Sequence, residues 1–246
     1  MIIKKHVMKP PRIIVYGDAG IGKTTFAAGA PSPVFIGTED GLGSLDADCF
    51  DEITSYASVI EALAHLGREE HQYKTVVIDS LDWLEPLVWD ATCQRMKIPS
   101  IETPGWARGY IEAQEEWRTV LQYLTALRDY RGMMVIMIAH ATTTRIEDPL
   151  HPAYDKYMLK LNKRAAALCG EDADIIGFAS LETYTTSEKA SGFVDKDERR
   201  SRVLSTDSRV IRLQPSGAYV AKNRYGMPAS LPLVWSEFEK HLPGRE

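Results

Sequence analysis

The sequence predicts an α/β fold in which a mostly parallel sheet is flanked by helices and followed by a C-terminal antiparallel extension. Three observations support this prediction. Short apolar runs alternate with helical patterns as far as Asp174, a glycine-rich loop joins the first run to a helix, and several short strands separated by turn residues follow. At 246 residues the chain fits one domain, with a core over about 10–181 and an extension over about 182–242.

The composition is that of an ordinary globular protein, with 44% hydrophobic and 26% charged residues. No apolar run reaches the ~18 residues that span a bilayer, so we expect no membrane partner. Cys49, Cys93 and Cys169 form no CxxC pair and no Cys/His cluster, which predicts buried, reduced thiols, a cytoplasmic location and no structural zinc. The net charge of −5 argues against a surface that is basic throughout but allows a local basic stripe.

A phosphate-binding loop is the strongest motif in the chain. Residues 17–24 match the P-loop pattern G-x-x-x-x-G-K-[ST], after an apolar run at 13–16 and before a helix-forming stretch at 25–28. Its glycines let backbone N–H groups and a helix N-terminus face a polyphosphate, Lys23 would reach the β- and γ-phosphates, and the Thr24 hydroxyl would bind Mg²⁺. The sequence therefore predicts a nucleoside triphosphate site formed by Gly17, Asp18, Ala19, Gly20, Ile21, Gly22, Lys23, Thr24 and Thr25.

Two further buried strands end in carboxylates. The run at 33–37 is followed by Glu39, which is explained equally well by a ligand site at the carboxyl edge of a sheet and by a solvated acidic turn. The β-branched run at 75–78 is closed by Asp79. An aspartate in this position after a P-loop is the Walker B arrangement, so we expect Asp79 to hold Mg²⁺ through water while Thr24 binds it directly.

The central part of the chain predicts two helices and one more strand. Residues 56–66 and 110–130 have helical apolar spacing, whereas 81–106 looks like an irregular, aromatic-rich segment. The apolar run at 133–139 delivers His140 to the same sheet edge as Asp79 and Glu39. This position favours a contact near the γ-phosphate, the alternative being a hydrogen-bonded polar residue without such a role.

The polar stretch 141–161 is too long for a routine connection, so we expect it to be mobile or functional. Four basic residues at helical spacing lie toward the end of this stretch and just after it: Lys156, Lys160, Lys163 and Arg164. They predict either a basic stripe on one helix face or a helix face that is simply solvated. Further on, short strands are expected at 175–181, 202–205, 210–213 and 219–221, with a mobile hairpin tip at 182–200.

The order of these parts resembles the RecA-like ATPase core. It is most similar to the small core-only recombinase-type ATP-binding proteins of bacteriophages, which are linked to single-strand annealing, and the resemblance covers roughly Pro10 to Leu242. It implies ATP and Mg²⁺ as ligands. It also implies that Glu39 activates the attacking water, and that His140 occupies the place of a γ-phosphate sensor that is commonly glutamine.

A second resemblance concerns the segment Lys222-Asn223-Arg224-Tyr225-Gly226. It is similar to the Lys-Asn-Arg-Phe-Gly motif of bacterial RadA and to the related segment of DnaB-type helicases. The resemblance implies that Lys222 and Arg224 reach a nucleotide bound by the neighbouring subunit and neutralise charge on the transferred phosphoryl group. Such sites imply self-association as a ring or filament with ATP at the subunit interface.

Together these features predict an ATPase, stimulated by single-stranded DNA, that acts in phage recombination or annealing in the host cytoplasm. A single-strand binding protein is a further candidate partner. Two alternatives stay open: an ATP-gated assembly or loading factor without a direct DNA role, and a P-loop kinase. A kinase usually carries an arginine-rich lid, and the only arginine cluster here is Arg199, Arg200 and Arg202.

Overall fold

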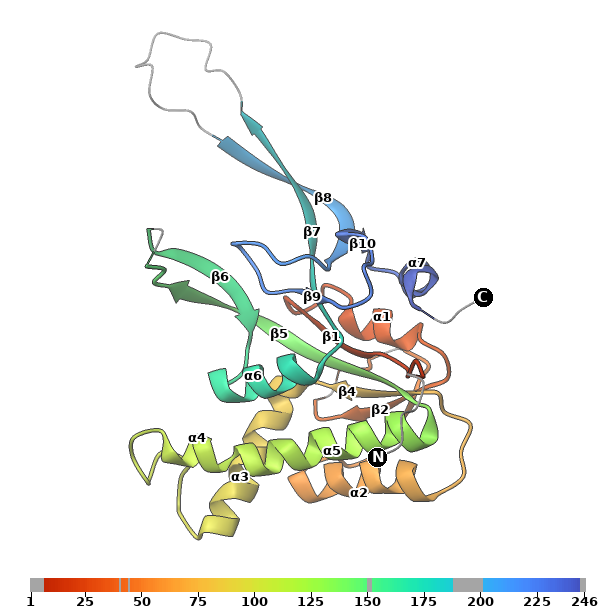
Figure 1. The fold of residues 1–246 in the computed structure, drawn as a ribbon, viewed down its shortest axis with the longest axis vertical. Helices are drawn as coiled ribbons and strands as arrows, with labels where there is room; N and C mark the ends of the chain where they lie inside the picture. Colours follow the sequence, from red (N-terminus) through yellow and green to blue (C-terminus); the bar gives the residue numbers. More distant parts are fainter. Residues whose placement is uncertain (1–6, 40, 44, 150–151, 188–200, 244–246) are drawn as a thin grey trace, which may run out of the picture.

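The computed structural model describes residues 7–39, 41–43, 45–149, 152–187 and 201–243, in which ten strands form one sheet (Figure 1). Eight of them follow the order β10-β8-β7-β1-β5-β4-β2-β3, while β6 pairs with β5 and β9 with β7. Six neighbouring strands, from β7 to the edge strand β3, run parallel to one another: β1 (Arg12–Gly17), β2 (Pro33–Gly37), β3 (Asp48–Cys49), β4 (Thr75–Asp79), β5 (Met134–Ile146) and β7 (Ile175–Ser187). Four pair antiparallel: β6 (Tyr154–Leu159), β8 (Ser201–Arg212), β9 (Lys222–Asn223) and β10 (Ser230–Pro232). The predicted fold class, a P-loop NTPase fold with a mostly parallel sheet, is confirmed.

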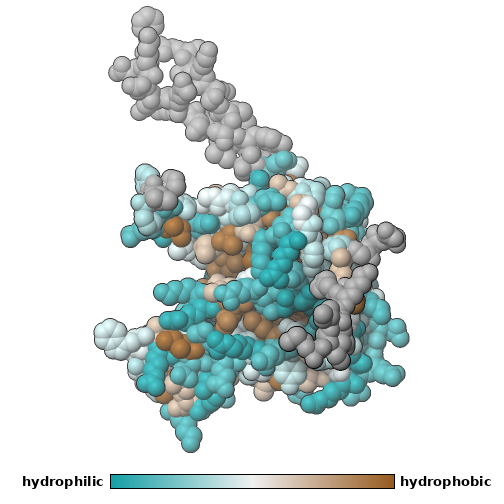
Figure 2. Space-filling view, in the orientation of Figure 1, coloured by the Kyte–Doolittle hydropathy of each residue, from teal (hydrophilic) through white to brown (hydrophobic). Residues whose placement is uncertain are grey.

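Helices bury both faces of the sheet. In β1, Ile13 and Val15 pack into one core and Ile14 and Tyr16 into the other, which explains why the parallel strands are continuously apolar. One face is covered by α1 (Lys23–Ala28) and α7 (Trp235–Phe238). The other is covered by α2 (Tyr56–Arg68), α3 (Leu81–Met96), α5 (Gln114–Arg131) and α6 (Lys163–Asp172), with α4 (Arg108–Glu112) and the 3₁₀ turn η1 (Glu239–His241) completing the helices of the described part. The surface seen in Figure 2 is mostly hydrophilic.

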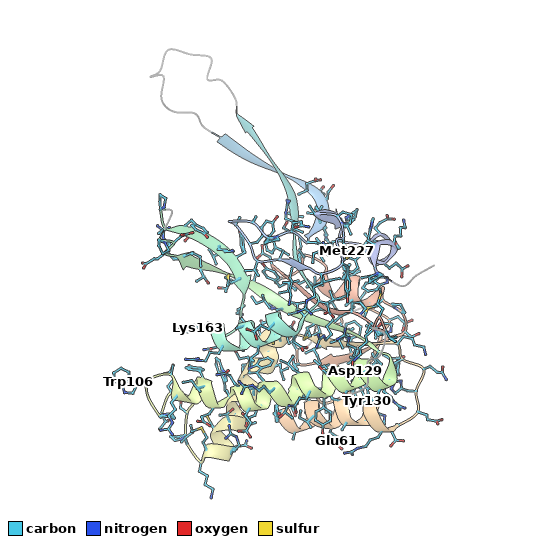
Figure 3. All side chains as sticks on the ribbon, viewed as in Figure 1. Glu61, Trp106, Asp129, Tyr130, Lys163 and Met227 are labelled. Atoms are coloured by element: carbon cyan, nitrogen blue, oxygen red, sulfur yellow. The ribbon has the colours of Figure 1, made fainter. Side chains whose placement is uncertain are left out.

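The expectation of an irregular segment over 81–106 was wrong for its first part, because α3 occupies Leu81–Met96. The buried side of α3 carries two polar residues. The Thr92 hydroxyl donates to the Val88 carbonyl, and Glu85 accepts from the backbone of Asn162. These satisfied polar groups break the apolar pattern. The remainder is irregular as expected, and Trp106 projects from it fully exposed (Figure 3).

The expected long loop at 141–161 is a β-hairpin. Strand β5 continues past His140 to Ile146 and pairs with β6 from Ala141↔Leu159 to Ile146↔Tyr154. The predicted helical basic stripe is also wrong, because its four members are divided between β6, the turn after it and α6. Their shared spacing in the sequence therefore places them on no common helix face.

The C-terminal extension is built on a second hairpin. Strand β7 is parallel to β1 over Ile175–Ala179 and then pairs antiparallel with β8 as far as Ser187↔Ser201, so the two strands expected at 202–205 and 210–213 are one. The predicted hairpin tip includes 188–200, which lie outside the described residues. In the expected strand at 219–221, Tyr219 forms one bridge, to Tyr157. Contrary to expectation, Cys49 is exposed.

Candidate functional site

The site lies where β1, β2, β4 and β5 reach the same edge of the sheet. Gly17 is level with His140 across β1 and β5, and Gly37 is level with Asp79 across β2 and β4. Because parallel strands present their carboxyl ends together, residues far apart in the sequence converge there. They line a cavity of about 410 Å³ formed by Gly20, Gly22, Lys23, Thr24, Thr25, Glu39, Gly41, Leu42, Leu45, Asp79, His140 and Arg209.

The loop between β1 and α1 has the backbone that the glycine pattern predicts. Gly20 and Gly22 have φ values of 74° and 104°, in the left-handed region that favours glycine. The buried ammonium of Lys23 donates to the carbonyls of Gly17 at 3.0 Å and Asp18 at 2.9 Å, so the side chain lies across the loop. Burial lowers the pKa of Lys23, an effect that nearby carboxylates, Asp79 foremost, partly oppose.

Thr24 and Asp79 are in direct contact. The Thr24 hydroxyl donates to Asp79 Oδ2 at 2.8 Å, and the Asp79 side chain is buried. Burial raises the pKa of Asp79, while the Thr24 hydrogen bond and the Lys23 ammonium oppose the rise. In the described residues no three His, Cys, Asp or Glu side chains are grouped to hold a metal by themselves. A hydroxyl beside a single carboxylate suits Mg²⁺, which keeps several waters and takes its other ligands from phosphates.

Glu39 and His140 line the same cavity, Glu39 from the segment after β2 and His140 from β5. Burial and the nearby Asp79 raise the pKa of Glu39, which favours a carboxylate that accepts a proton readily. His140 is held by Asp82, whose Oδ1 accepts from the His140 backbone N–H at 2.9 Å and whose Oδ2 lies 2.9 Å from Nδ1. Burial acts to raise the pKa of Asp82, but these hydrogen bonds bring it below its ordinary value.

Two residues of this site were missed from the sequence. Asp82 lies in the first turn of α3, in a segment expected to be irregular. Arg209 comes from β8, and its side chain makes no hydrogen bond or ion pair within the described part of the chain. A Cβ added at Gly22 would meet its Nη1 at 3.0 Å. The signal for Asp82 was its closeness to the end of β4, whereas nothing local marks Arg209.

Lys222 and Arg224 lie away from this cavity. Asn223, between them, pairs with Ile175, and Ile175 pairs with Ile13 near the start of β1, so the segment is at the opposite edge of the sheet. The Lys222 ammonium donates to the carbonyls of Gly170 at 2.8 Å and Glu171 at 3.0 Å. Arg224 Nη1 donates to Asp174 Oδ1 at 2.8 Å. The structure therefore does not bring these two side chains to their own P-loop.

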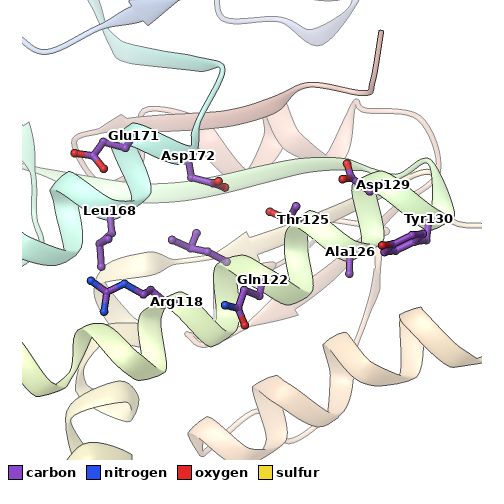
Figure 4. Close-up of a pocket in the computed structure, with 10 residues that line it drawn as sticks. Arg118, Gln122, Thr125, Ala126, Asp129, Tyr130, Leu168, Glu171 and Asp172 are labelled. Atoms are coloured by element: carbon purple, nitrogen blue, oxygen red, sulfur yellow. The ribbon is translucent and has the colours of Figure 1, made fainter. Parts of the chain in front are cut away.

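A separate cavity of about 580 Å³ lies between α5 and α6 (Figure 4). Its lining includes Thr125 and Asp172, both hydrogen-bonded to the Arg12 side chain at the beginning of β1. This cavity is therefore at the edge of the sheet opposite the P-loop. Arg199 and Arg200, from the only arginine cluster noted in the sequence, lie outside the described residues.

Comparison with known proteins places these features in a family context. The family model for an AAA domain (AAA_24) matches residues 9–225. The SPbeta prophage-derived uncharacterized protein YorG of Bacillus subtilis (strain 168) is 24% identical over 174 residues, which cover 68% of this chain and 50% of that protein. The chain thus spans about half the length of this curated relative. The crystal structure of the RadB recombinase aligns with a TM-score of 0.42 and 13% identity over 79% of this chain and 87% of that one. Among the described residues, the helices are too short or too polar to cross a membrane.

Proposed function

The chain belongs to the AAA domain family, and we propose that it is a RecA-like ATPase that acts on single-stranded DNA in phage-type recombination or annealing. One observation carries the proposal: Lys23, Thr24, Glu39, Asp79 and His140 line a single cavity at the carboxyl edge of a parallel sheet. A structural turn has no need of a buried lysine beside three ionisable groups. We also propose one domain, with its core over about 10–181 and the extension over about 182–242.

The cavity's residues divide the chemistry among them. Lys23 binds the β- and γ-phosphates, so it must leave the two carbonyls that it contacts here. Thr24 and, through water, Asp79 would hold Mg²⁺, which neutralises charge on the phosphate oxygens when bound. Glu39 orients the attacking water and accepts its proton, a task suited to a carboxylate whose pKa is raised.

His140 connects the phosphate site to the β5–β6 hairpin. The hairpin begins at the residue after it, and the backbone N–H of Lys160, at the other end of the hairpin, donates to the His140 carbonyl at 2.9 Å. Loss of the γ-phosphate would therefore change the contacts of His140 at the base of the hairpin. We propose that the hairpin contacts the DNA strand and switches between ordered and mobile states when ATP is hydrolysed. Contacts to phosphates by its lysine and arginine side chains would be sequence-tolerant and salt-sensitive.

Lys222 and Arg224 would act on a nucleotide bound by a neighbouring copy. Their position at the edge of the sheet opposite the P-loop supports this proposal, because a head-to-tail arrangement of copies juxtaposes opposite faces. ATP would then lie at the interface of a ring or filament. A single-strand binding protein remains a candidate partner, and the host cytoplasm the proposed location.

The test is steady-state ATP hydrolysis with and without single-stranded DNA, at low and moderate salt. We expect turnover that rises with DNA, loses this stimulation as salt increases, and is abolished by Lys23→Ala. Turnover that depends on Lys23 but is indifferent to DNA would contradict the DNA role. That result would favour the ATP-gated assembly factor instead.

A further inference from the structure

A third cavity, of about 690 Å³, lies on the outer side of the P-loop. It is separate from the phosphate site but shares Gly20 and Arg209 with it. Its walls come from β6, from β7 and β8, and from the segment before β9, so it lies between the two hairpins that extend from the sheet (Figure 1). Its volume is within the range of about 300–1,000 Å³ that is typical of small-ligand sites.

Three aromatic rings from different elements form one wall. The ring of Phe178 is stacked with Tyr157 at a centroid distance of 5.0 Å and with Tyr219 at 5.1 Å. Tyr157 is 39% exposed, whereas Phe178 is buried. Aromatic faces that remain accessible stack on nucleobases without strong sequence preference.

The aromatic wall is held in place by hydrogen bonds. The Tyr16 hydroxyl donates to the Val220 carbonyl at 2.7 Å and accepts from the Val220 N–H at 3.0 Å. The Tyr157 N–H donates to the Ala218 carbonyl at 2.8 Å, which ties β6 to the same segment. A wall fixed in this way costs little conformational entropy when a ligand binds.

The cavity also carries positive charge. The Arg212 guanidinium lies 6.0 Å from the centre of the Tyr219 ring, and its Nε donates to the Ser180 hydroxyl at 3.3 Å. Arg209 is exposed and its side chain has no partner in the described chain, where Asp18 is the one carboxylate in the lining. Two guanidinium groups beside aromatic faces suit a ligand that combines flat bases with phosphates.

We propose that this cavity binds an unstacked nucleobase, with its adjoining phosphate, from single-stranded DNA. The inference rests on the proposed DNA function and adds to it a specific subsite. The adenine of ATP is the less suitable occupant, because the phosphate cavity has Leu42 and Leu45 of its own for apolar contacts. A base in the outer cavity would press on residues 18–21, the outer side of the loop that holds the phosphates, and would thereby link DNA binding to hydrolysis.

The test compares two labelled strands that differ only in their bases: oligo-dT and an abasic strand with the same number of phosphates. Fluorescence anisotropy at fixed salt measures binding to the full-length chain. We expect the wild-type protein to prefer oligo-dT, and Tyr157→Leu to weaken oligo-dT binding about tenfold while leaving the abasic strand nearly unchanged. Arg212→Gln should weaken both strands. Tyr157→Phe keeps the ring and should retain the preference.

Tyr130→Leu is the matched control, because Tyr130 is 87% exposed and lines the cavity between α5 and α6 instead. A preference for oligo-dT that survives Tyr157→Leu would overturn the subsite but leave the DNA function standing. Failure of the wild-type protein to bind either strand would overturn both. Weakened binding of a fluorescent ATP analogue by Tyr157→Leu without DNA would assign the cavity to the nucleotide instead.

Discussion

Asp82 and His140 are joined twice, because Asp82 Oδ1 accepts from the His140 backbone N–H at 2.9 Å and Oδ2 lies 2.9 Å from Nδ1. The pKa of Asp82 is held below its ordinary value, so the carboxylate is ionised and can only accept. Nδ1 therefore carries the proton, and Nε2 is the nitrogen left for other contacts. Donation from Nε2 to a phosphate therefore requires a ring that carries protons on both nitrogens.

Replacing this carboxylate should weaken the communication between nucleotide and DNA. In Asp82→Asn, we expect ATP binding to persist and DNA-stimulated turnover to fall about tenfold, because a charge-assisted hydrogen bond to His140 is lost. Asp90→Asn, an exposed position on the same helix, is the control. In a His140→Gln background, whose amide donates without a second proton, Asp82→Asn should have little further effect on turnover. An equal loss in both backgrounds would remove His140 from the explanation.

Glu39→Gln should bind ATP but hydrolyse it about 10²- to 10⁴-fold more slowly, since the amide cannot accept the proton from water. In the wild-type protein, the raised pKa of Glu39 places the loss of activity at low pH nearer to neutrality than an ordinary glutamate would. Measuring the steady-state kcat as a function of pH would locate this loss of activity at low pH. Glu61→Gln, on the exposed side of α2, should leave the profile unchanged. Normal turnover in Glu39→Gln would exclude Glu39 as the base.

Arg209 should contribute to phosphate binding within its own subunit. Its guanidinium lies beside Gly22 in the phosphate cavity and has no partner in the described chain. Arg209→Gln is therefore expected to raise KM for ATP about tenfold, the loss typical of a charge-assisted hydrogen bond. Arg118→Gln, an exposed arginine on α5, serves as the comparison. An unchanged KM would show that Arg209 does not contact the nucleotide.

Much of the site could be predicted because its parts are local in sequence. Asp79 and His140 each follow an apolar run, and parallel strands bring such positions together without further information. Arg209 could not be found in this way. It reaches Gly22 because β8 folds back beside β7, a tertiary contact between residues that are distant in the sequence.

Two of the errors in secondary structure have a common physical origin, since in both a tertiary contact overrides the local sequence pattern. Helix α3 buries Glu85 and Thr92, and hydrogen bonds stabilise these polar side chains. The core-facing side of the helix is therefore not recognisable from its apolar residues alone. The threonines of 142–144 look like loop residues but extend β5, because pairing with β6 satisfies their backbone. The hydropathy of the sequence alone indicates neither the hydrogen bonds of these buried polar residues nor the pairing of β5 with β6.

Arg224→Ala should retain the fold and ATP binding yet lose turnover. Asp174 keeps the backbone N–H of Arg12 at 3.0 Å and Arg128 Nη2 at 3.6 Å, so removing Arg224 leaves no unpaired buried carboxylate. If sites are shared between copies, mixing Arg224→Ala with Lys23→Ala protein should restore part of the turnover. Mixing Lys23→Ala with Glu39→Gln protein should restore no turnover, because both residues act on the nucleotide that is bound by their own subunit. Absence of restoration in the first mixture would contradict shared sites.

Glu85 should make stability depend on pH. Burial raises its pKa from 4.5 to about 7, although the Asn162 N–H donates to it at 3.0 Å. The folded protein holds this proton more tightly than the unfolded chain does, so the protonated Glu85 contributes up to about 3 kcal/mol to the free energy of unfolding. This contribution is fully present below about pH 4.5 and is lost as the pH rises through about 7. Glu85→Gln accepts the same N–H without a charge, so its thermal unfolding should vary less across that interval and its Tm should exceed that of the wild type at the upper end. Glu61→Gln should reproduce the wild-type dependence, and an unchanged slope in Glu85→Gln would show that this carboxyl is not the group responsible.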